Sequence, residues 1–266
     1  MAVRASRAHL PVAAFVLHRY DWSESSLILD LFTRELGRVA VAAKGAKRPY
    51  SQWRSVLLPF QRIHAAFGRI GSGDPPAEVL NLRSAEWAGG AAMLTGGALF
   101  SGFYLNELLM KLLARGDPHP ALFDAYAHTL PSLSAATDNP REAALRAFEL
   151  VLLRETGVLP DLARITATQQ PVRSDARYTL LAQAGVSAPR SDDEASLAGD
   201  VLAGLQAALD ANRLEALQAA CMSGLPALKS LLRAVLHYHL GSAPLRTRQV
   251  MLDLQKFANL GKTASP

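Results

Sequence analysis

The sequence is poor in cysteine and in long apolar runs, and both shortages restrict what the protein can be. Among its 266 residues the only cysteine is Cys221. One cysteine excludes a disulfide within the chain and a zinc site built from several thiolates. No apolar run reaches the ~18–20 residues of a membrane span, and Arg19 and Asp21 arrive too early for a secretory signal. We therefore expect a cytoplasmic protein with no cofactor, no metal and no membrane contact.

The chain also lacks the motifs of common enzyme classes. It contains no G-x-x-x-x-G-K-[ST] loop and no G-x-S-x-G turn. The glycine-rich run at 68–73 leads into Asp74-Pro75-Pro76 instead of a helix, which favours a hairpin over a phosphate site. His237 and His239 would project about 200° apart on a helix and cannot share a metal ion. We expect no catalysis, although a hydrolase with an unrecognised site stays an alternative.

Positive charge is concentrated in the first third of the chain. The formal net charge is +5, and residues 1–83 hold 12 Lys or Arg against six Asp or Glu, whereas residues 84–266 hold 16 against 17. The stretch 34–62 has seven basic residues and one acidic residue. Such an asymmetry indicates a polyanionic partner, most simply a phosphate backbone. The plainer alternative is a solvated basic face that aids solubility.

Five short segments of this first third have the character of β-strands. They are rich in β-branched and aromatic residues and are separated by turn-forming residues: Val12–Tyr20, Leu27–Thr33, Arg38–Ala43, Leu58–Phe67 and Ala77–Ser84. A long basic loop, 44–55, separates the third from the fourth. Their number and length match a five-stranded oligonucleotide-binding (OB) barrel. Other small barrels, SH3-like ones included, fit the count nearly as well.

From about residue 86 the apolar residues recur at helical spacing. We expect one helix that ends near 115–118, followed by helices at Pro120–Leu133, Pro140–Thr156, Ala195–Ala211, Leu214–Met222, Pro226–Leu240 and Arg246–Phe257. Asp138 and Asn139 are the expected N-caps of the helix Pro140–Thr156. Several Pro and Gly between 157 and 193 predict a small irregular insert, with Tyr178–Ala182 as its best strand. The predicted fold is α+β, with an OB domain at 1–85 and a helical domain at 86–266.

Six segments, in order along nearly the whole chain, resemble the RecO family of bacterial DNA repair and recombination proteins. They are VLHRYDWSESSLIL (16–29), LGRVAVAAKGAKR (36–48), YLNELL (104–109), DPHPALF (117–123), LRAFELVLLRETG (145–157) and PLRTR (244–248). The resemblance implies an OB domain before a helical domain, binding to single- and double-stranded DNA, and annealing of complementary strands. It also implies work with RecR and with the C-terminal tail of single-stranded DNA-binding protein (SSB) to place RecA on SSB-coated DNA.

One departure from the family concerns the insert. Some RecO proteins carry a four-cysteine zinc module in the region that corresponds to 157–185, and this chain has no cysteine there. We therefore expect a zinc-free insert whose shape the resemblance leaves undetermined.

Candidate binding residues fall into three groups. The proposed DNA groove consists of Arg34, Arg38, Lys44, Lys47, Arg48 and Arg54, with Tyr50 and Trp53 as rings that can stack on bases. For Trp53 the alternative is that it anchors the loop on the barrel. Arg246 and Arg248 are either a second DNA contact or ordinary surface charges. An acidic tail could dock on Arg154, Leu231, Leu232, Arg233 and Leu236, but leucines at this spacing are more often core. The competing function is RNA binding by the same barrel, as in a translation factor.

Overall fold

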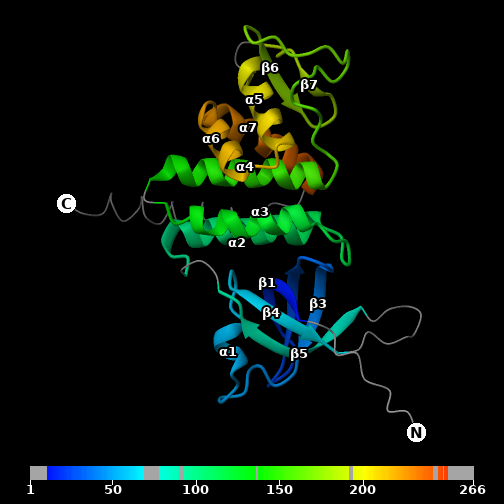
Figure 1. Cartoon of the computed structure of the whole chain (residues 1–266), viewed down its shortest axis with the longest axis vertical. Coiled ribbons are helices and arrows are strands. Elements are labelled where there is room, and N and C mark those ends of the chain that lie inside the picture. Colours follow the sequence, from blue (N-terminus) through cyan, green and yellow to red (C-terminus); the bar gives the residue numbers. More distant parts are fainter. Residues whose placement is uncertain are drawn as a thin grey trace, which may run out of the picture. The chain divides into compact units, whose positions relative to one another are not determined.

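The chain forms two compact units, which the computed structural model describes for residues 11–68, 78–89, 93–135, 137–191, 194–241, 245–247 and 249–250 (Figure 1). The first unit holds the described residues of Met1–Met93 and of Leu113–Phe123, and the second those of Leu94–Leu112 and Asp124–Pro266. Whereas the sequence suggested one boundary near residue 85, the segment Leu113–Phe123 returns to the first unit. It does so because the ring of Phe123 packs 5.1 Å from that of Phe15 and 5.5 Å from that of Phe32.

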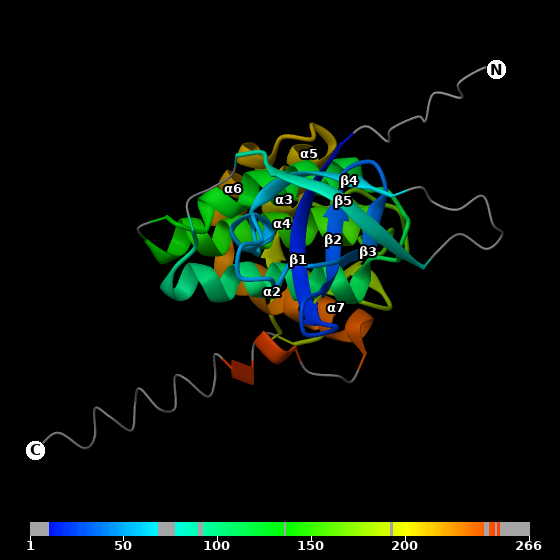
Figure 2. The same ribbon diagram turned by 90° about the horizontal axis from the view of Figure 1, so that it is seen from below.

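Five strands of the first unit close into a barrel (Figure 2). They are β1 (Val12–Asp21), β2 (Leu27–Thr33), β3 (Gly37–Ala43), β4 (Arg62–Phe67) and β5 (Val79–Trp87). Their order is β1-β2-β3-β5-β4, with β3 and β5 parallel and β4 antiparallel to β1. A short helix, α1 (Trp53–Val56), lies in the long loop between β3 and β4. The prediction of a five-stranded OB barrel is confirmed.

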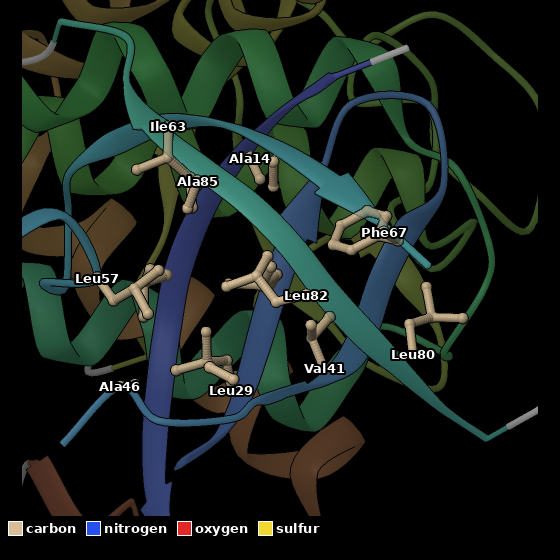
Figure 3. Close-up of a cluster of buried hydrophobic side chains, with 14 residues drawn as sticks. Ala14, Leu29, Val41, Ala46, Leu57, Ile63, Phe67, Leu80, Leu82 and Ala85 are labelled. Atoms are coloured by element: carbon tan, nitrogen blue, oxygen red, sulfur yellow. The ribbon is translucent and has the colours of Figure 1, made fainter. Parts of the chain in front are cut away.

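Alternation along the strands fills the barrel interior. Leu29 and Val41 point inward and are fully buried among the aliphatic residues of β4 and β5 (Figure 3), and Leu31 belongs to the same buried cluster. Each such side chain stabilises the fold by about 1.5–3 kcal/mol relative to exposure. A one-residue slip would turn these side chains outward, so the hydrophobic pattern also fixes the register.

Gly37 explains how the segment Leu113–Phe123 reaches the barrel. Its φ is +65°, and a Cβ atom there would lie 2.0 Å from the carbonyl oxygen of Asp117. Next to this contact, the N–H of Gly116 donates to the carbonyl oxygen of Arg38 at 2.9 Å. Only glycine permits both the conformation and the approach, so the start of β3 is built to receive this segment.

The second unit is mainly helical. Its elements are α2 (Gly96–Leu112), α3 (Pro120–Ser132, whose first four residues count with the first unit), α4 (Asp138–Glu155), α5 (Gly199–Asp210), α6 (Leu214–Met222) and α7 (Leu225–Leu240). Helix α4, in which Ala143–Leu153 are buried, packs against α6 and α7. Cys221 of α6 is buried, which raises the pKa of its thiol to about 12 and leaves it protonated. Within the described residues no single helix is long and apolar enough to cross a bilayer, and only the bent pair of α6 and α7 passes by length and composition.

Two predicted helix starts need correction, and one predicted helix is only partly described. Helix α4 begins at Asp138, its N-cap is Thr137, and the cap makes no side-chain hydrogen bond. Helix α5 begins at Gly199, later than the predicted Ala195, because Leu197 and Ala198 are paired in a strand. The predicted helix Arg246–Phe257 is helical at the described residues among 246–250, and its remainder lies outside the described residues.

The insert contains a small sheet with the order β7-β6-β8, built from β6 (Arg177–Leu181), β7 (Gly185–Ser187) and β8 (Leu197–Ala198). The predicted strand at 178–182 is thus confirmed to within a residue. The backbone N–H of Thr166 donates to the carbonyl oxygen of Val186 at 2.9 Å, and the Thr166 hydroxyl accepts the Val186 N–H at 2.9 Å. Backbone and hydroxyl hydrogen bonds therefore connect the loop at 161–171 to this sheet.

Glu107 of α2 holds the start of the C-terminal helix. Its carboxylate accepts the backbone N–H groups of Arg246 and Thr247 at 2.8 and 3.0 Å and the Thr247 hydroxyl at 2.7 Å. Burial alone would raise the pKa of Glu107, but the hydrogen bonds from Thr247 and Arg246, with the charge of Lys111, lower it below its ordinary value. The ionised carboxylate thus acts as a cap on these N–H groups.

Replacing Glu107 with glutamine is expected to cost about 0.5–2 kcal/mol at neutral pH, the usual worth of a helix cap. A carboxyl whose pKa is lowered on folding stabilises the protein above its unfolded-state pKa, and this contribution is lost as the pH falls through the folded-state pKa. The stability difference between the native protein and Glu107→Gln should therefore shrink as the solution is acidified. Denaturant unfolding at several pH values measures this stability difference, with Glu86→Gln, at an exposed position of β5, as the control. A difference that grows in acid would contradict this role.

Candidate nucleic-acid interface

Two loops meet at one end of the barrel. Leu27, the first residue of β2, pairs with Ala43, the last of β3, so the β1–β2 turn and the loop after β3 start side by side. The backbone N–H of Lys47 donates to the carbonyl oxygen of Ser25 at 2.9 Å, and that of Gly45 donates to the Ser26 hydroxyl at 3.3 Å. The two loops therefore form one hydrogen-bonded frame.

The first of two hollows in this frame, called here the turn hollow, has a volume of about 540 Å³ and is lined by Trp22, Ser23, Ser25, Ser26, Lys44, Gly45 and Arg48. Lys44 and Arg48 are exposed. The Trp22 side chain is 57% exposed although it is a large apolar group. Two cations, an aromatic ring and three serines thus line the same space, which suits a phosphate with its attached base.

The second hollow, called the mouth hollow, measures about 500 Å³ and is lined by Arg19, Asp21, Leu27, Ala46, Lys47, Trp53, Arg54 and Leu57. Arg19 donates to the carbonyl oxygen of Leu57 at 3.2 Å. Lys47 lies 3.0 Å from the exposed Asp21 carboxylate and donates to the carbonyl oxygen of Ser23 at 3.1 Å. Three cations against one carboxylate leave this hollow positive.

The structure distributes the predicted groove over several places. Lys44 and Arg48 line the turn hollow, Lys47 and Arg54 line the mouth hollow, and Tyr50 lies in the same loop with 98% of its side chain exposed. Trp53 is half-buried and packs against the barrel core, which is the anchoring alternative of the sequence analysis. The loop cluster therefore keeps four of the six predicted cations.

Arg34 and Arg38 do not join this cluster. Arg34 follows β2, at the end of the β2–β3 hairpin opposite to Lys44, and the seven-residue strand between them spans roughly 20 Å. The guanidinium of Arg38 donates to both carboxylate oxygens of Asp30, at 2.9 and 3.1 Å, and to the carbonyl oxygen of Leu113 at 3.0 Å. Asp30 is 1% exposed and Arg38 15%. We therefore remove Arg38 from the groove and assign it to the barrel's structure.

Sequence reasoning missed two residues of the site. Arg19 lies near the end of β1 and lines the mouth hollow, whereas in the sequence it stands out only as an interruption of an apolar run. Trp22 stands in a turn among serines and acids, where an aromatic side chain has no core to fill. The available signal was an aromatic ring in a turn close to basic residues, because rings beside cations can stack on the bases of a bound strand.

Most of the predicted tail-docking residues are not a free surface. Leu231, Leu232 and Leu236 are buried in α7, so the core alternative holds for them. Arg154 donates to the carbonyl oxygen of Leu209 and to the side chain of Asn212, and so caps the end of α5. Arg233 and Arg246 are exposed, and Arg248 lies outside the described residues.

Comparison with known proteins agrees with this architecture. The chain matches the family "Recombination protein O N terminal" over residues 10–73 and "Recombination protein O C terminal" over 93–249. It is 56% identical over 243 residues to a DNA repair protein RecO from a Polaromonas species, which covers 91% of this chain and 95% of the relative. It is 50% identical over 264 residues to a protein of the same name from Variovorax paradoxus, covering 96% and 99%. The chain therefore belongs to the RecO family of DNA repair and recombination proteins.

Proposed function

We propose that the protein binds single- and double-stranded DNA at the loop end of its barrel, anneals complementary strands and, together with RecR, assists the loading of RecA onto SSB-coated DNA. One observation carries the DNA-binding part. Five cations surround the two hollows with a single carboxylate among them: Arg19, Lys44, Lys47, Arg48 and Arg54. Lysine and arginine side chains so placed neutralise phosphates and release condensed counterions.

Annealing follows from this charge without a chemical step. Cations on the loops contact phosphates and carry no sequence information by themselves. Two complementary strands held at such a surface repel each other less, and base pairing then proceeds with a decrease in free energy. The proposal therefore needs no catalytic group and treats the protein as a non-enzymatic mediator.

The proposed protein partners rest on family membership. RecR and the acidic C-terminal tail of SSB are inferred because RecO proteins work with them, and RecA is reached indirectly. An acidic tail would seek an exposed cation with apolar neighbours. With the leucines of α7 buried, we place that contact on the helical unit without assigning residues to it.

Binding and annealing assays test the proposal on the full chain. Affinities for single-stranded DNA, duplex DNA and RNA of equal length are compared in one salt concentration, and annealing of complementary strands is followed with and without SSB. We expect binding to both DNA forms and faster annealing of bare and SSB-coated strands. Preference for RNA would favour the RNA-binding alternative. Absence of DNA binding would overturn the proposal.

A further inference from the structure

Two aromatic rings lie on the outer face of β1, and a third, that of Trp22, follows in the turn just after the strand and lines the turn hollow. His18, Tyr20 and Trp22 alternate along the chain, and the rings of His18 and Tyr20 are 4.4 Å apart, edge to face. Tyr20 is 46% exposed and Trp22 57%. His18 and Tyr20 pair with Asp30 and Ile28 of β2, which alternate with the inward Leu29 and Leu31, so the rings of His18 and Tyr20 point away from the barrel interior.

The strand register brings this row beside the cations. Tyr20 pairs with Ile28 of β2, which pairs with Ala42 of β3, so the three residues lie abreast on the outer face. Two residues further along, beyond the ends of β1 and β3, Trp22 and Lys44 line the turn hollow together. The rings therefore end beside an exposed cation of that hollow.

The turn that carries Trp22 is held by hydrogen bonds on both sides. The backbone N–H groups of Trp22 and Ser23 donate to the carbonyl oxygen of Ser26 at 3.3 and 3.4 Å. Lys47 reaches across from the neighbouring loop to the carbonyl oxygen of Ser23. A turn fixed in this way presents the indole with little loss of conformational entropy on binding.

The other two tryptophans show that exposure of Trp22 is not a general feature of the barrel. Trp53 packs against the hydrophobic core. Trp87 is exposed at the end of β5, but its indole N–H donates to the Gln61 side chain at 3.1 Å and it lines neither hollow. Trp22 is the tryptophan that combines exposure, a braced turn and neighbouring cations.

We propose that Trp22, with Tyr20 beside it, is a stacking platform for unpaired bases and makes the turn hollow selective for single-stranded DNA. The mouth hollow, whose Trp53 ring is packed inward, contacts phosphates of either DNA form. Stacking requires a free base face, which an unpaired strand offers; in a duplex the neighbouring base pairs cover it, and exposing it costs unstacking energy. This inference rests on the DNA binding proposed above and adds a residue that discriminates between the two DNA forms.

The test compares Trp22→Ala with Trp87→Ala, a matched loss of an exposed indole from the same barrel. Affinities for a thymidine oligonucleotide and for a duplex of equal length are measured at one salt concentration, after thermal unfolding has shown that the variants are folded. Trp22→Ala should weaken single-strand binding by at least about fivefold, the lower end of the worth of one stacked base, and leave duplex affinity unchanged. Trp22→Tyr should restore most of the loss, and Trp87→Ala should change neither affinity.

A fluorescence measurement gives an independent readout. In a Trp53→Phe/Trp87→Phe variant the remaining indole is Trp22, and its emission should be quenched by the oligonucleotide and not by the duplex. Equal losses on both DNA forms, or no loss on the single strand, would overturn the inference while leaving the proposed function intact. Failure of the native protein to bind either DNA form would instead refute the proposed function itself.

Discussion

Replacing Arg38 with alanine is expected to destabilise the barrel by about 3–5 kcal/mol, the usual cost of leaving one partner of a buried ion pair alone. The variant removes the two hydrogen bonds that the Asp30 carboxylate accepts from Arg38, and Asp30 is almost wholly buried. The nearest remaining cation, Arg115, lies 3.7 Å away and is half exposed. Leu113 also loses the donor to its carbonyl oxygen, so attachment of the segment Leu113–Phe123 should weaken as well.

Denaturant unfolding and DNA binding together separate this role from a phosphate contact. Arg83→Ala, at an exposed position of β5, removes an equal charge and should cost less than about 1 kcal/mol, as surface substitutions usually do. Adding Asp30→Asn to Arg38→Ala should recover part of the stability, because no buried charge is then left uncompensated. If Arg38→Ala kept native stability but lost DNA affinity, the sequence interpretation of Arg38 as a phosphate ligand would be reinstated.

The barrel could be predicted because its strands are short, rich in β-branched and aromatic residues, and bounded by turn-forming residues. Alternation is hidden in β2, where Phe32 is apolar and fully buried although it lies on the face opposite to Leu29 and Leu31. The helices of the second unit could be predicted because their apolar residues recur at helical spacing. Their exact starts could not be predicted, since the pairing of Leu197 and Ala198 with β6 is a tertiary contact that local propensity does not contain.

The sequence located the charge but could not tell which cations were already paired. In the sequence Arg38 and Lys44 are equivalent, since each is a basic residue in or next to β3. In the structure Arg38 binds the buried carboxylate of Asp30, eight residues earlier, whereas Lys44 lines an open hollow. Asp30 sits inside an apolar strand, where a carboxylate needs a partner. That position was the one local sign that a nearby arginine would form an ion pair with Asp30.

The helical unit shows the same limit for apolar residues. The leucines of α7 have the spacing expected both of a core stripe and of a docking groove, and the pattern alone does not say which. Arg146 and Glu149, within one of the segments that resemble RecO, form a buried ion pair at 2.6 Å, and Tyr104 donates to the same carboxylate at 2.7 Å. Burial alone would lower the pKa of Arg146, but the charge of the neighbouring Glu149 raises it above its ordinary value. Part of the family resemblance therefore reflects packing instead of function.

The number of phosphates held by the loop end determines how DNA affinity responds to salt. For single-stranded DNA each neutralised phosphate contributes about −0.7 to the slope of log affinity against log salt concentration. Five contacts, one for each cation of the two hollows, predict a slope of about −3.5. Between 50 and 200 mM salt, affinity would then fall by roughly 100-fold.

The triple variant Lys44→Ala/Arg48→Ala/Arg54→Ala removes three of these cations, all exposed and none of them part of the barrel core. Its slope should be flatter by about 2, so that the same change of salt costs roughly sevenfold. The matched control Arg190→Ala/Arg213→Ala/Arg233→Ala changes the net charge equally, at exposed positions of the second unit, and should keep the native slope. Salt titration of single-stranded DNA binding measures all three proteins. A flattened slope in the loop variant alone is the predicted result, and an unchanged slope in that variant would contradict a DNA-binding site at this end of the barrel.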